Sequence, residues 1–499
     1  MPGQFDRSEA LRRLASERFD VLVIGGGITG AGVALDAASR GLRTALVERQ
    51  DFASGTSSKS SKMVHGGLRY LQQRDFRLVY EGLHERQRLL DNAPHLVTPL
   101  PFLIPLFGRE GIINKGVART YATALWLYDA TGGWRIGKRH RRIDRAETLA
   151  HLPTLRTDRL VAGFLYYDAR ADDARLTLAV ARTAALDHDA VVANYAEVTR
   201  LLHNPAGKVT AARVRPVAPG DESSDGHGEF DVEASVVVNA TGVWADDVRA
   251  LDEGIHPHSL RPAKGIHVTV PRSRLPADIA AVIPVPKDRR SIFVVPWFDG
   301  DDVYLGTTDT AWDGPLDDPA CLPEDVDYVL DAANGATTSA LTRQDVTGVW
   351  AGLRPLLAPA AGAHVSERTA DLSRRHTVRQ SPNGVVTVTG GKLTTYRRMA
   401  EDTVDVVVGR LGSAAPAGSR RSPTRRLSLR GAAGLVALRR PGAAVDAGLD
   451  EDTFAALVNR HGGETPAVLA LADGHPELLD PLVAGLPYLR AEAVWAVRK

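Results

Sequence analysis

Short apolar runs and a longer helical periodicity alternate along the first fifty residues. Val21–Ile24 form an apolar run rich in β-branched residues, which is typical of a buried parallel strand. A helical pattern follows over residues 28–40 and stops at Gly41, a residue type that commonly ends helices. A second apolar run covers residues 44–47. The pattern therefore predicts a strand, a helix and a second strand in succession.

The rest of the chain continues the same alternation of strand-like and helix-like segments. We predict further strands at residues 191–194, 235–239, 262–270, 291–295, 303–305 and 385–388. We predict further helices at residues 1–18, 76–96, 115–128, 170–187 and 393–402. Residues 412–426 have the composition of a linker, and the segment after them has helical patterning up to Lys499.

Three glycines with GxGxxG spacing join the first strand to the first helix. Gly25 permits a tight turn, Gly27 lets the backbone approach a pyrophosphate, and Gly30 allows close packing of helix and strand. The N-terminus of the helix favours anions because its N–H groups are free and its dipole is positive there. Glu48 ends the second strand about 20 residues later, where a ribose-binding carboxylate belongs. These features together predict a dinucleotide site.

Composition excludes several classes of function. The 499 residues are enough for two or three domains, and a net charge of +1 gives no electrostatic case for nucleic-acid binding. Cys321 is the single cysteine, so a disulfide within the chain and an all-cysteine metal cluster are excluded, and we expect no metal site. No apolar run reaches transmembrane length, and the first 20 residues lack the apolar core of a signal peptide. We therefore expect any membrane contact to be peripheral.

Two further stretches carry groups that can do chemistry. Residues 54–61 form a Ser/Thr/Gly loop that is suited to hydrogen bonding with phosphate. The loop leads into residues 65–70, HGGLRY, which place an imidazole, two glycines, a guanidinium and a phenol within one short segment. Arg354 ends an apolar run before a proline, and a buried arginine needs an anion. The chain thus has groups for acid–base chemistry and for anion binding.

Three motifs of the sequence resemble those of the FAD-dependent glycerol-3-phosphate dehydrogenases, which belong to a broader amino-acid-oxidase-like group of flavoproteins. The motifs are GGGITGAGVALDAASRGL at residues 25–42, SSKSSKMVHGGLRYL at residues 57–71 and TGGKLTTYRRMAED at residues 389–402. The similarity runs from about residue 19 to the end of the chain. It implies an α/β fold: a Rossmann-like FAD-binding domain, interleaved with an antiparallel-sheet substrate domain, and an α-helical C-terminal cap.

The resemblance also implies domain boundaries. Residues 1–411 form the oxidoreductase region, with FAD-binding parts at about 19–75, 160–260 and 345–411 and substrate-binding parts at about 76–159 and 261–344. A linker at 412–426 precedes a helical domain at 427–499. Because the family continues beyond the AVRK at this end of the chain, we expect the helical domain to be truncated.

The implied reaction is the oxidation of sn-glycerol 3-phosphate to dihydroxyacetone phosphate. Hydride passes to flavin N5, and a respiratory quinone receives the electrons, which places the protein in the cytoplasm, peripheral on the inner face of the cell membrane. The aromatic helix at 115–128 and the basic run at 135–145 could lie on an anionic membrane. They could equally be a core helix and a solvated charge run. The oligomeric state stays open, a homodimer included.

The residues implied for cofactor binding come from all parts of the oxidoreductase region. They are Gly25, Gly27, Ile28, Thr29, Gly30, Glu48, Arg49, Thr56, Ser57, Ser58, His65, Gly66, Gly67, Leu68, Val198, Ala240, Thr241, Gly242, Gly391, Lys392, Leu393 and Thr394.

The residues expected to bind the substrate supply the cations that a dianionic phosphate needs, with one phenol as a further donor. They are Arg69, Tyr70, Arg354, Arg374 and Lys392. Arg374 departs from the family pattern in its surroundings: Arg375 and His376 follow it, where an acid and an aromatic residue are usual. Its role is therefore less well supported by the resemblance.

The residues expected to act in catalysis are Arg354 and a histidine base, because the pKa of histidine lies near working pH. His65 is the first choice and His267 the second, and the sequence does not decide between them. Three alternative functions stay open: an oxidase that uses O₂, an amino-acid or 2-hydroxyacid oxidoreductase, and an FAD-binding protein without catalysis.

Overall fold

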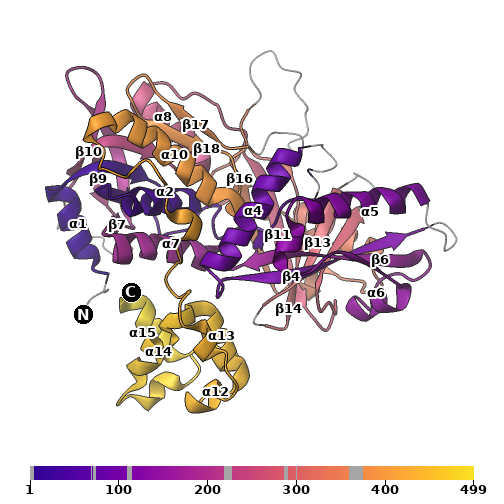
Figure 1. The fold of residues 1–499 in the computed structure, drawn as a ribbon. Coiled ribbons are helices and arrows are strands. Elements are labelled where there is room, and N and C mark those ends of the chain that lie inside the picture. The colour runs from indigo at the N-terminus through magenta and orange to yellow at the C-terminus, as the bar shows by residue number, and fades with distance from the viewer. Residues whose placement is uncertain are drawn as a thin grey trace.

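The computed structural model describes residues 5–68, 70, 75–108, 115–217, 228–285, 290–298, 300–358 and 375–498 (Figure 1). Two β-sheets with helices on their faces form the main body. A group of short helices, drawn in yellow in Figure 1, lies beside the main body next to α7 (Asp173–His188).

The first sheet has the strand order β17–β18–β10–β1–β2–β7, to which β9 adds beside β10 and β8 beside β9. Its strands are β1 (Arg18–Ile24), β2 (Thr44–Val47), β7 (Val191–Ala193), β8 (Ala196–His203), β9 (Val209–Pro216), β10 (Phe230–Asn239), β17 (Thr377–Gln380) and β18 (Val386–Thr389). The central strands β18, β10, β1, β2 and β7 run parallel. Successive side chains alternate between the faces, so Val21 and Val23 enter one core cluster and Leu22 and Ile24 another.

Helices cover both faces of this parallel sheet. One face carries α2 (Ile28–Ser39), α7 and α10 (Tyr396–Leu411), which pack against one another. The other face carries α1 (Arg7–Ser16) and α8 (Ala245–Glu253). The strand, helix and strand predicted from residues 21–47 are all confirmed, and Gly41 takes the left-handed φ of +84° that a helix end favours.

The second sheet has the order β15–β11–β14–β13–β12–β4–β6–β3, with β16 beside β11 and β5 beside β6. Its strands are β3 (Met63–Val64), β4 (Val97–Phe107), β5 (Arg141–Ile143), β6 (Leu160–Ala171), β11 (Ala263–Pro271), β12 (Ala280–Val285), β13 (Arg290–Pro296), β14 (Asp302–Gly306), β15 (Thr310–Ala311) and β16 (Gly348–Arg354). The pairings are antiparallel apart from β4 with β12.

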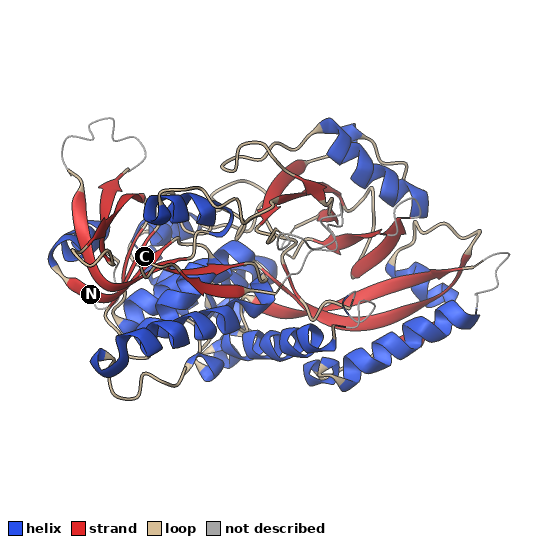
Figure 2. Cartoon of the chain, turned by 90° about the horizontal axis from the view of Figure 1, so that it is seen from above, coloured by secondary structure: helices blue, strands red, loops and turns tan. Residues whose placement is uncertain are grey.

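Helices also flank the second sheet, and Figure 2 shows its long strands running between them. One face packs on α4 (Phe76–Asn92) and α5 (Lys115–Ala130), and the other on α6 (Arg145–His151) and α9 (Pro323–Ala336). Short 3₁₀ turns, some of which connect these elements, are η1 (Gly133–Ile136), η2 (Gly242–Trp244), η3 (Arg343–Asp345), η5 (Leu393–Thr395), η6 (Gly412–Ala414), η7 (Thr424–Arg426), η8 (Gly462–Glu464), η9 (Ala470–Ala472) and η10 (Pro476–Leu479).

The sheets divide the chain differently from the ranges expected from the sequence. β3, β6 and β16 fall in ranges that we assigned to the FAD-binding part, yet they pair in the second sheet. The chain therefore crosses between the two sheets inside the expected segments, and the expected boundaries at 160 and 345 fall just before strands of the second sheet.

The C-terminal helices form small cores of their own. They are α11 (Leu435–Leu438), α12 (Ala443–Asp446), α13 (Glu451–His461), α14 (Thr465–Leu469) and α15 (Arg490–Arg498). Glu464 connects them to the main body, because it pairs with Arg182 of α7 at 2.7 Å. Across the described ranges, no helix combines the length and the apolar character needed to cross a bilayer.

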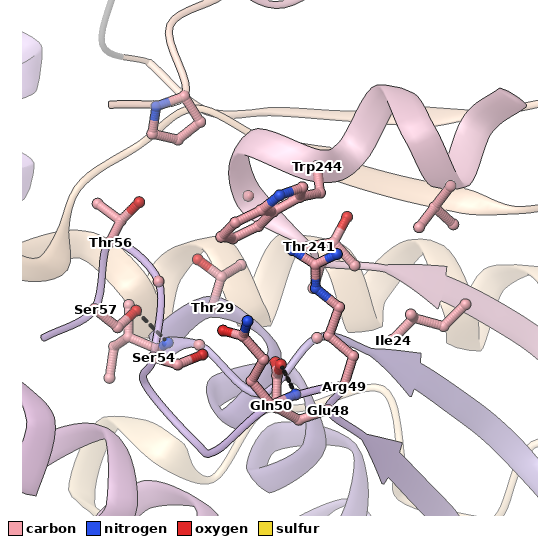
Figure 3. A pocket seen from close by; sticks show the side chains of 18 of the residues that line it. Ile24, Thr29, Glu48, Arg49, Gln50, Ser54, Thr56, Ser57, Thr241 and Trp244 are labelled. Carbon is pink, nitrogen blue, oxygen red and sulfur yellow. Dashed lines mark hydrogen bonds between the residues drawn. The ribbon is translucent and has the colours of Figure 1, made fainter. Parts of the chain in front are cut away.

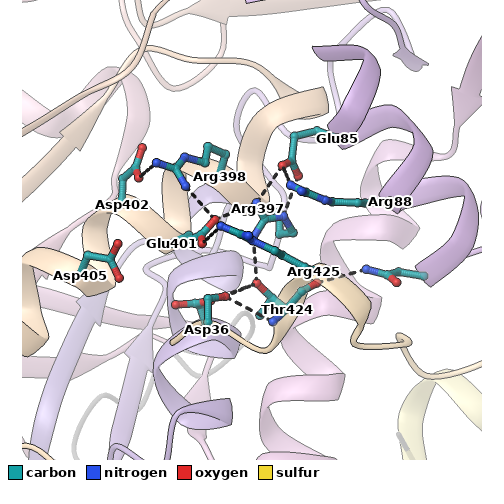
Figure 4. A network of polar contacts seen from close by, with 12 residues as sticks. Asp36, Glu85, Arg88, Arg397, Arg398, Glu401, Asp402, Asp405, Thr424 and Arg425 are labelled. Carbon is teal, nitrogen blue, oxygen red and sulfur yellow. Dashed lines mark hydrogen bonds and ion pairs between the residues drawn. The ribbon is translucent and has the colours of Figure 1, made fainter. Parts of the chain in front are cut away.

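A buried polar network fastens α10 to α4 and to the segment expected as a linker (Figure 4). Arg397 of α10 makes two 2.7 Å hydrogen bonds to the Glu85 carboxylate on α4, and its third nitrogen donates to Thr424 at 3.2 Å. Arg397 also reaches Glu401, at 2.9 Å. Burial raises the pKa of Glu401, but hydrogen bonds and charge from Arg397 and other arginines overcome this effect and bring the pKa to about 2. The Glu401 carboxylate therefore stays ionised at neutral pH.

We expect Glu85→Gln to destabilise the protein strongly, because it leaves the Arg397 guanidinium buried with one carboxylate fewer. Removing one partner of a buried ion pair typically costs about 3–5 kcal/mol, so the urea midpoint of unfolding should fall clearly. As a matched control, Asp327→Asn removes the partner of Arg343 in a pair whose side chains are about half exposed. That midpoint should barely move, since exposed pairs contribute little. Equal shifts in both variants would contradict the assigned importance of the network.

Candidate functional site

A cavity of about 610 Å³ lies at the carboxyl ends of β1, β2 and β10 (Figure 3). This edge of a parallel sheet is where ligands bind in doubly wound folds. The turn after β1, the loop at residues 54–57 and the turn after β10 all contribute to its lining. The size and the position suit a dinucleotide.

The glycines of the first turn are required by close backbone contacts. Gly25 has a φ of +109°, and a Cβ there would lie 2.8 Å from the carbonyl oxygen of Ala240. A Cβ on Gly30 would lie 1.8 Å from the carbonyl oxygen of Gly25, so Gly30 serves the packing of α2 on the turn. Gly27 is the N-cap of α2 and provides no side-chain cap. The Ser57 hydroxyl accepts from the Ile28 N–H at 2.9 Å, and the N–H groups that follow at the N-terminus of α2 suit an anion in this cavity.

Glu48 places a carboxylate at the end of β2, beside the same turn. It accepts hydrogen bonds from the backbone N–H groups of Gly26 at 2.7 Å and Gln50 at 2.9 Å. Burial raises the pKa of Glu48, and these backbone donors counteract the effect in part. A carboxylate held in this way can accept a hydrogen bond from a ribose hydroxyl. The glycine turn, the helix N-terminus and Glu48 together fit the ADP half of FAD.

A second cavity of about 410 Å³ lies between the second sheet and the turn before α10. The two cavities share part of their lining. The shared residues are Thr56, Ser60, Pro355, Gly390, Gly391, Lys392 and Leu393. A cofactor in the first cavity and a substrate in the second would therefore meet at this common wall.

The turn that forms the common wall is another glycine-dependent structure. Gly390 and Gly391 have φ values of +77° and +80°. A Cβ on Gly391 would approach the Sδ of Met399 to 2.2 Å, so a side chain does not fit there. The Lys392 ammonium lies 3.7 Å over the ring of Tyr70. This turn is followed by η5 and then by α10, and Leu393 at the start of η5 is part of the common wall.

The second cavity is lined by several cations. Among the described residues, its lining includes four cations and one carboxylate, namely Arg354, Arg290, Lys59 and Lys392 with Asp309. Arg354 pairs with Asp309 at 3.4 Å and donates to the carbonyl oxygen of Thr308 at 3.2 Å. Arg290 donates to the backbone carbonyl of Asp309 at 3.3 Å. The excess of positive charge suits an anionic substrate such as a phosphate ester.

The two candidate histidines occupy different environments in the second cavity. His267 is buried, stacks on Trp350 with ring centroids 4.7 Å apart, and shares a 2.9 Å hydrogen bond with Ser61 through Nε2. Burial, with the charges of Arg354 and Lys62, lowers the pKa of His267 to about 3. The His267 ring is therefore neutral at working pH and is a weak base. His65 is only partly buried, and its backbone N–H donates to Thr394 at 3.1 Å.

Most of the residues predicted for the cofactor line one or both cavities. Those in the first cavity are Gly25, Gly27, Ile28, Thr29, Glu48, Arg49, Thr56, Ser57, Val198, Ala240, Thr241, Gly242, Gly391, Lys392 and Leu393. His65, Gly67, Leu68 and Thr394 line the second cavity instead. Gly30, Ser58 and Gly66 do not appear in the lining of either cavity.

The residues predicted for the substrate are brought together in part. Tyr70, Arg354 and Lys392 line the second cavity, as do the two histidines. Arg69 and Arg374 lie outside the described residues. Sequence reasoning missed Lys59 and Arg290. Lys59 lies within the Ser/Thr/Gly loop, and Arg290 lies just before the strand predicted at 291–295. No motif around either residue indicates a binding role.

Comparisons with known proteins agree with this geometry. The family model described as FAD dependent oxidoreductase matches residues 20–397, and the C-terminal domain of alpha-glycerophosphate oxidase matches residues 422–499. Glycerol-3-phosphate dehydrogenase 2 of Mycobacterium tuberculosis is 43% identical over 99% of this chain and 80% of its own length. Glycerol-3-phosphate dehydrogenase of Mycobacterium leprae is 44% identical over the same shares.

A solved structure extends the similarity to the fold. The crystal structure of the glycerol-3-phosphate dehydrogenase from Bacillus halodurans complexed with FAD has a TM-score of 0.72 and 33% identity, and the match covers 94% of this chain and 81% of that one. The predicted fold class is thereby confirmed. The chain belongs to the FAD-dependent oxidoreductase family and, within it, to the glycerol-3-phosphate dehydrogenases.

Proposed function

We propose that this protein oxidises sn-glycerol 3-phosphate to dihydroxyacetone phosphate, with FAD as the hydride acceptor. The observation that carries the proposal is the common wall between the cavity suited to FAD and the cavity lined by cations. Arg354, Arg290, Lys59 and Lys392 bring positive charge to the second cavity, which suits an anionic substrate. The names of the relatives point to the same substrate.

The residues that would hold the substrate phosphate are the cations of the second cavity. Each charge-assisted hydrogen bond contributes roughly 1.5–3 kcal/mol net, so two or three such bonds account for recognition of a small phosphate ester. Arg354 is well placed for this role, because Asp309 and Thr308 already orient its guanidinium. Holding the phosphate directs the glycerol carbons of the substrate toward the common wall.

The proton on the C2 hydroxyl needs a base, and we assign this role to His65. The depressed pKa of His267 makes it a poor proton acceptor, whereas His65 lies in the same cavity and is less buried. His267 would instead orient the substrate by hydrogen bonding in its neutral form. FAD, when bound, supplies the acceptor for the hydride that leaves C2.

We also propose that the electrons pass on to a quinone at a membrane surface. The α5 face provides the support, because Leu125 and Tyr128 face the core while Trp126 is 69% exposed and Trp134 of η1 is 53% exposed. Exposed basic side chains follow along the chain, namely Arg135, Lys138, Arg139 and Arg142, and the Arg135 guanidinium lies over the Trp134 ring. Segments that combine exposed aromatic and basic side chains are typical of binding to an anionic bilayer surface. This placement favours peripheral attachment over the alternative of a solvated charge run.

The test of the function is anaerobic. Glycerol 3-phosphate added to the purified FAD-containing protein should bleach the oxidised flavin absorbance, and a quinone analogue should restore the absorbance faster than air does. Glycerol and inorganic phosphate, added separately, should not bleach the flavin. Protein that holds FAD but is bleached by an amino acid or a 2-hydroxyacid, and not by glycerol 3-phosphate, would refute the substrate assignment. Rapid recovery in air alone would favour an oxidase.

The base is tested by comparing His65→Gln with His267→Asn. Loss of a general base typically costs 10²–10⁴-fold in rate, so His65→Gln should lower kcat by about that factor. The wild-type rate should fall as the pH falls through the pKa of the base, since the protonated ring accepts no proton. His267 has a pKa of about 3, so His267→Asn should keep this acidic limb. If His267→Asn removes the limb and His65→Gln keeps it, the assignment is reversed.

Membrane binding is tested by Trp126→Ser combined with Trp134→Ser. Burying aromatic side chains in the bilayer interface drives such binding, so the double variant should bind phosphatidylglycerol vesicles about tenfold more weakly in a sedimentation assay. Leu178→Ser on α7 is the matched control, since Leu178 is also exposed, at 41%, but lies away from the α5 face. Neutral phosphatidylcholine vesicles should bind the wild type weakly. Unchanged binding of the double variant would exclude this surface.

A further inference from the structure

Three polar side chains are buried together behind the second cavity without lining it. Arg86 of α4 has no exposed side-chain surface, Asp168 of β6 has 2%, and Tyr128 of α5 has a residue exposure of 1%. We name these three residues the Tyr128 cluster. Burying polar groups costs free energy unless they are hydrogen-bonded, so the contacts of the cluster should show what it holds in place.

The donors of the cluster converge on the Asp168 carboxylate, and one of them is the backbone N–H of Gly66, the residue after His65. Arg86 donates as well to the backbone carbonyls of Tyr167 and Gly133. Arg86 donates to Asp168 Oδ1 at 2.7 Å, and the Tyr128 hydroxyl donates to the same carboxylate at 2.6 Å. The backbone N–H of Gly66 donates to the Tyr128 oxygen at 3.0 Å and to Asp168 Oδ1 at 3.3 Å. Burial and the charge of Asp168 raise the pKa of Tyr128, so the phenol keeps its proton and stays a donor.

The space around Gly66 leaves no room for a side chain. A Cβ on Gly66 would lie 2.6 Å from Leu83 and 2.7 Å from the Tyr128 hydroxyl oxygen. A Cβ on Gly82 of α4 would already lie 3.2 Å from the Gly66 Cα, so the helix crosses the segment closely. The chain at Gly66 therefore packs closely against both α4 and the Tyr128 hydroxyl. This fit explains why the sequence has glycine at position 66, although Gly66 does not line a cavity.

The His65 backbone is held on both sides by these contacts. Its own N–H donates at 3.1 Å to the hydroxyl of Thr394, which lines the second cavity, and the next N–H, that of Gly66, donates to the Tyr128 cluster. Two neighbouring backbone N–H groups thus tie the segment to Thr394 in the lining of the second cavity and to the Tyr128 cluster behind it. A proton acceptor needs such fixing, because an error of about 1 Å in its placement can cost 10²-fold in rate.

We propose that Tyr128 and Asp168 are positioning residues for His65, acting through the backbone N–H of Gly66. This inference rests on the proposed function of His65 as the base. The phenol accepts from Gly66 and donates to Asp168, and the 2.7 Å ion pair with Arg86 holds the Asp168 carboxylate beside the phenol. Hydrogen bonds linked in series strengthen one another, so removing the single hydroxyl of Tyr128 loosens the attachment of the segment.

The test is Tyr128→Phe, which removes one oxygen and keeps the ring in the core. We expect amide hydrogen exchange of the peptide that contains Gly66 to speed up about fivefold to tenfold, the effect of one lost hydrogen bond. For glycerol 3-phosphate, kcat should fall by about tenfold or more while KM stays within about twofold, because the substrate cations are untouched. The FAD content and the melting temperature should stay close to those of the wild type.

Two further variants make the result decisive. Tyr396→Phe removes the hydroxyl of another buried tyrosine whose pKa burial also raises, and it should leave both exchange at Gly66 and kcat unchanged. Asp168→Asn keeps the size of the side chain but leaves the Arg86 guanidinium buried without its carboxylate, so its melting temperature should fall. Measured below that temperature, its exchange at Gly66 and its kcat should change as in Tyr128→Phe. If Tyr128→Phe itself loses FAD or melts early, the role of the cluster is structural and the inference fails.

The outcomes also separate this inference from the proposed function. Unchanged exchange and unchanged kcat in Tyr128→Phe, with a wild type that is bleached by glycerol 3-phosphate, would overturn the positioning role and leave the function standing. Faster exchange at Gly66 without any loss of kcat would show that the attachment exists but does not serve catalysis, which also overturns the inference. A wild type that glycerol 3-phosphate does not bleach would refute the proposed function instead.

Discussion

The ion pair between Glu85 and Arg397 is the constraint on which the arrangement of the two cavities depends. Glu85 stands on α4, which packs on the second sheet, and Arg397 stands on α10, which packs on the first. Arg397 follows the turn at residues 390–395 that separates the cavities, so the pair fixes this turn relative to both sheets. A desolvated pair of this kind stabilises the structure only while both partners and their hydrogen bonds are present.

The common wall brings together the two cavities, one beside each sheet. The parallel sheet ends in the glycine turn, the α2 N-terminus and Glu48, which suit a dinucleotide. The antiparallel sheet contributes Arg290, His267 and Arg354, which suit a phosphate ester. Neither sheet forms the second cavity alone, because the turn before α10 and the segment after β3 complete it. Oxidation of the substrate beside a bound flavin follows from this junction.

Burial divides the polar groups of the molecule into two kinds. Glu85 pairs with Arg397, and Asp168 pairs with Arg86, so these buried charges hold elements together. The cations of the second cavity line a space where an anion can reach them. His267 lies between these cases, since burial and nearby cations keep its ring neutral. Histidines that look alike in the sequence therefore differ in chemistry because their surroundings differ.

The sequence by itself determined the parts of this protein that are local. The GxGxxG turn, its helix and Glu48 could be read from residues 21–48, because strand, turn and helix contact one another along the chain. The tertiary structure alone decided what depends on distant segments. Lys59, Arg290 and Arg354 meet in one cavity only because β13 and β16 join the second sheet, β13 between β12 and β14 and β16 beside β11. β4, with its three prolines, became a strand because β6 pairs along its whole length, which no local propensity indicates.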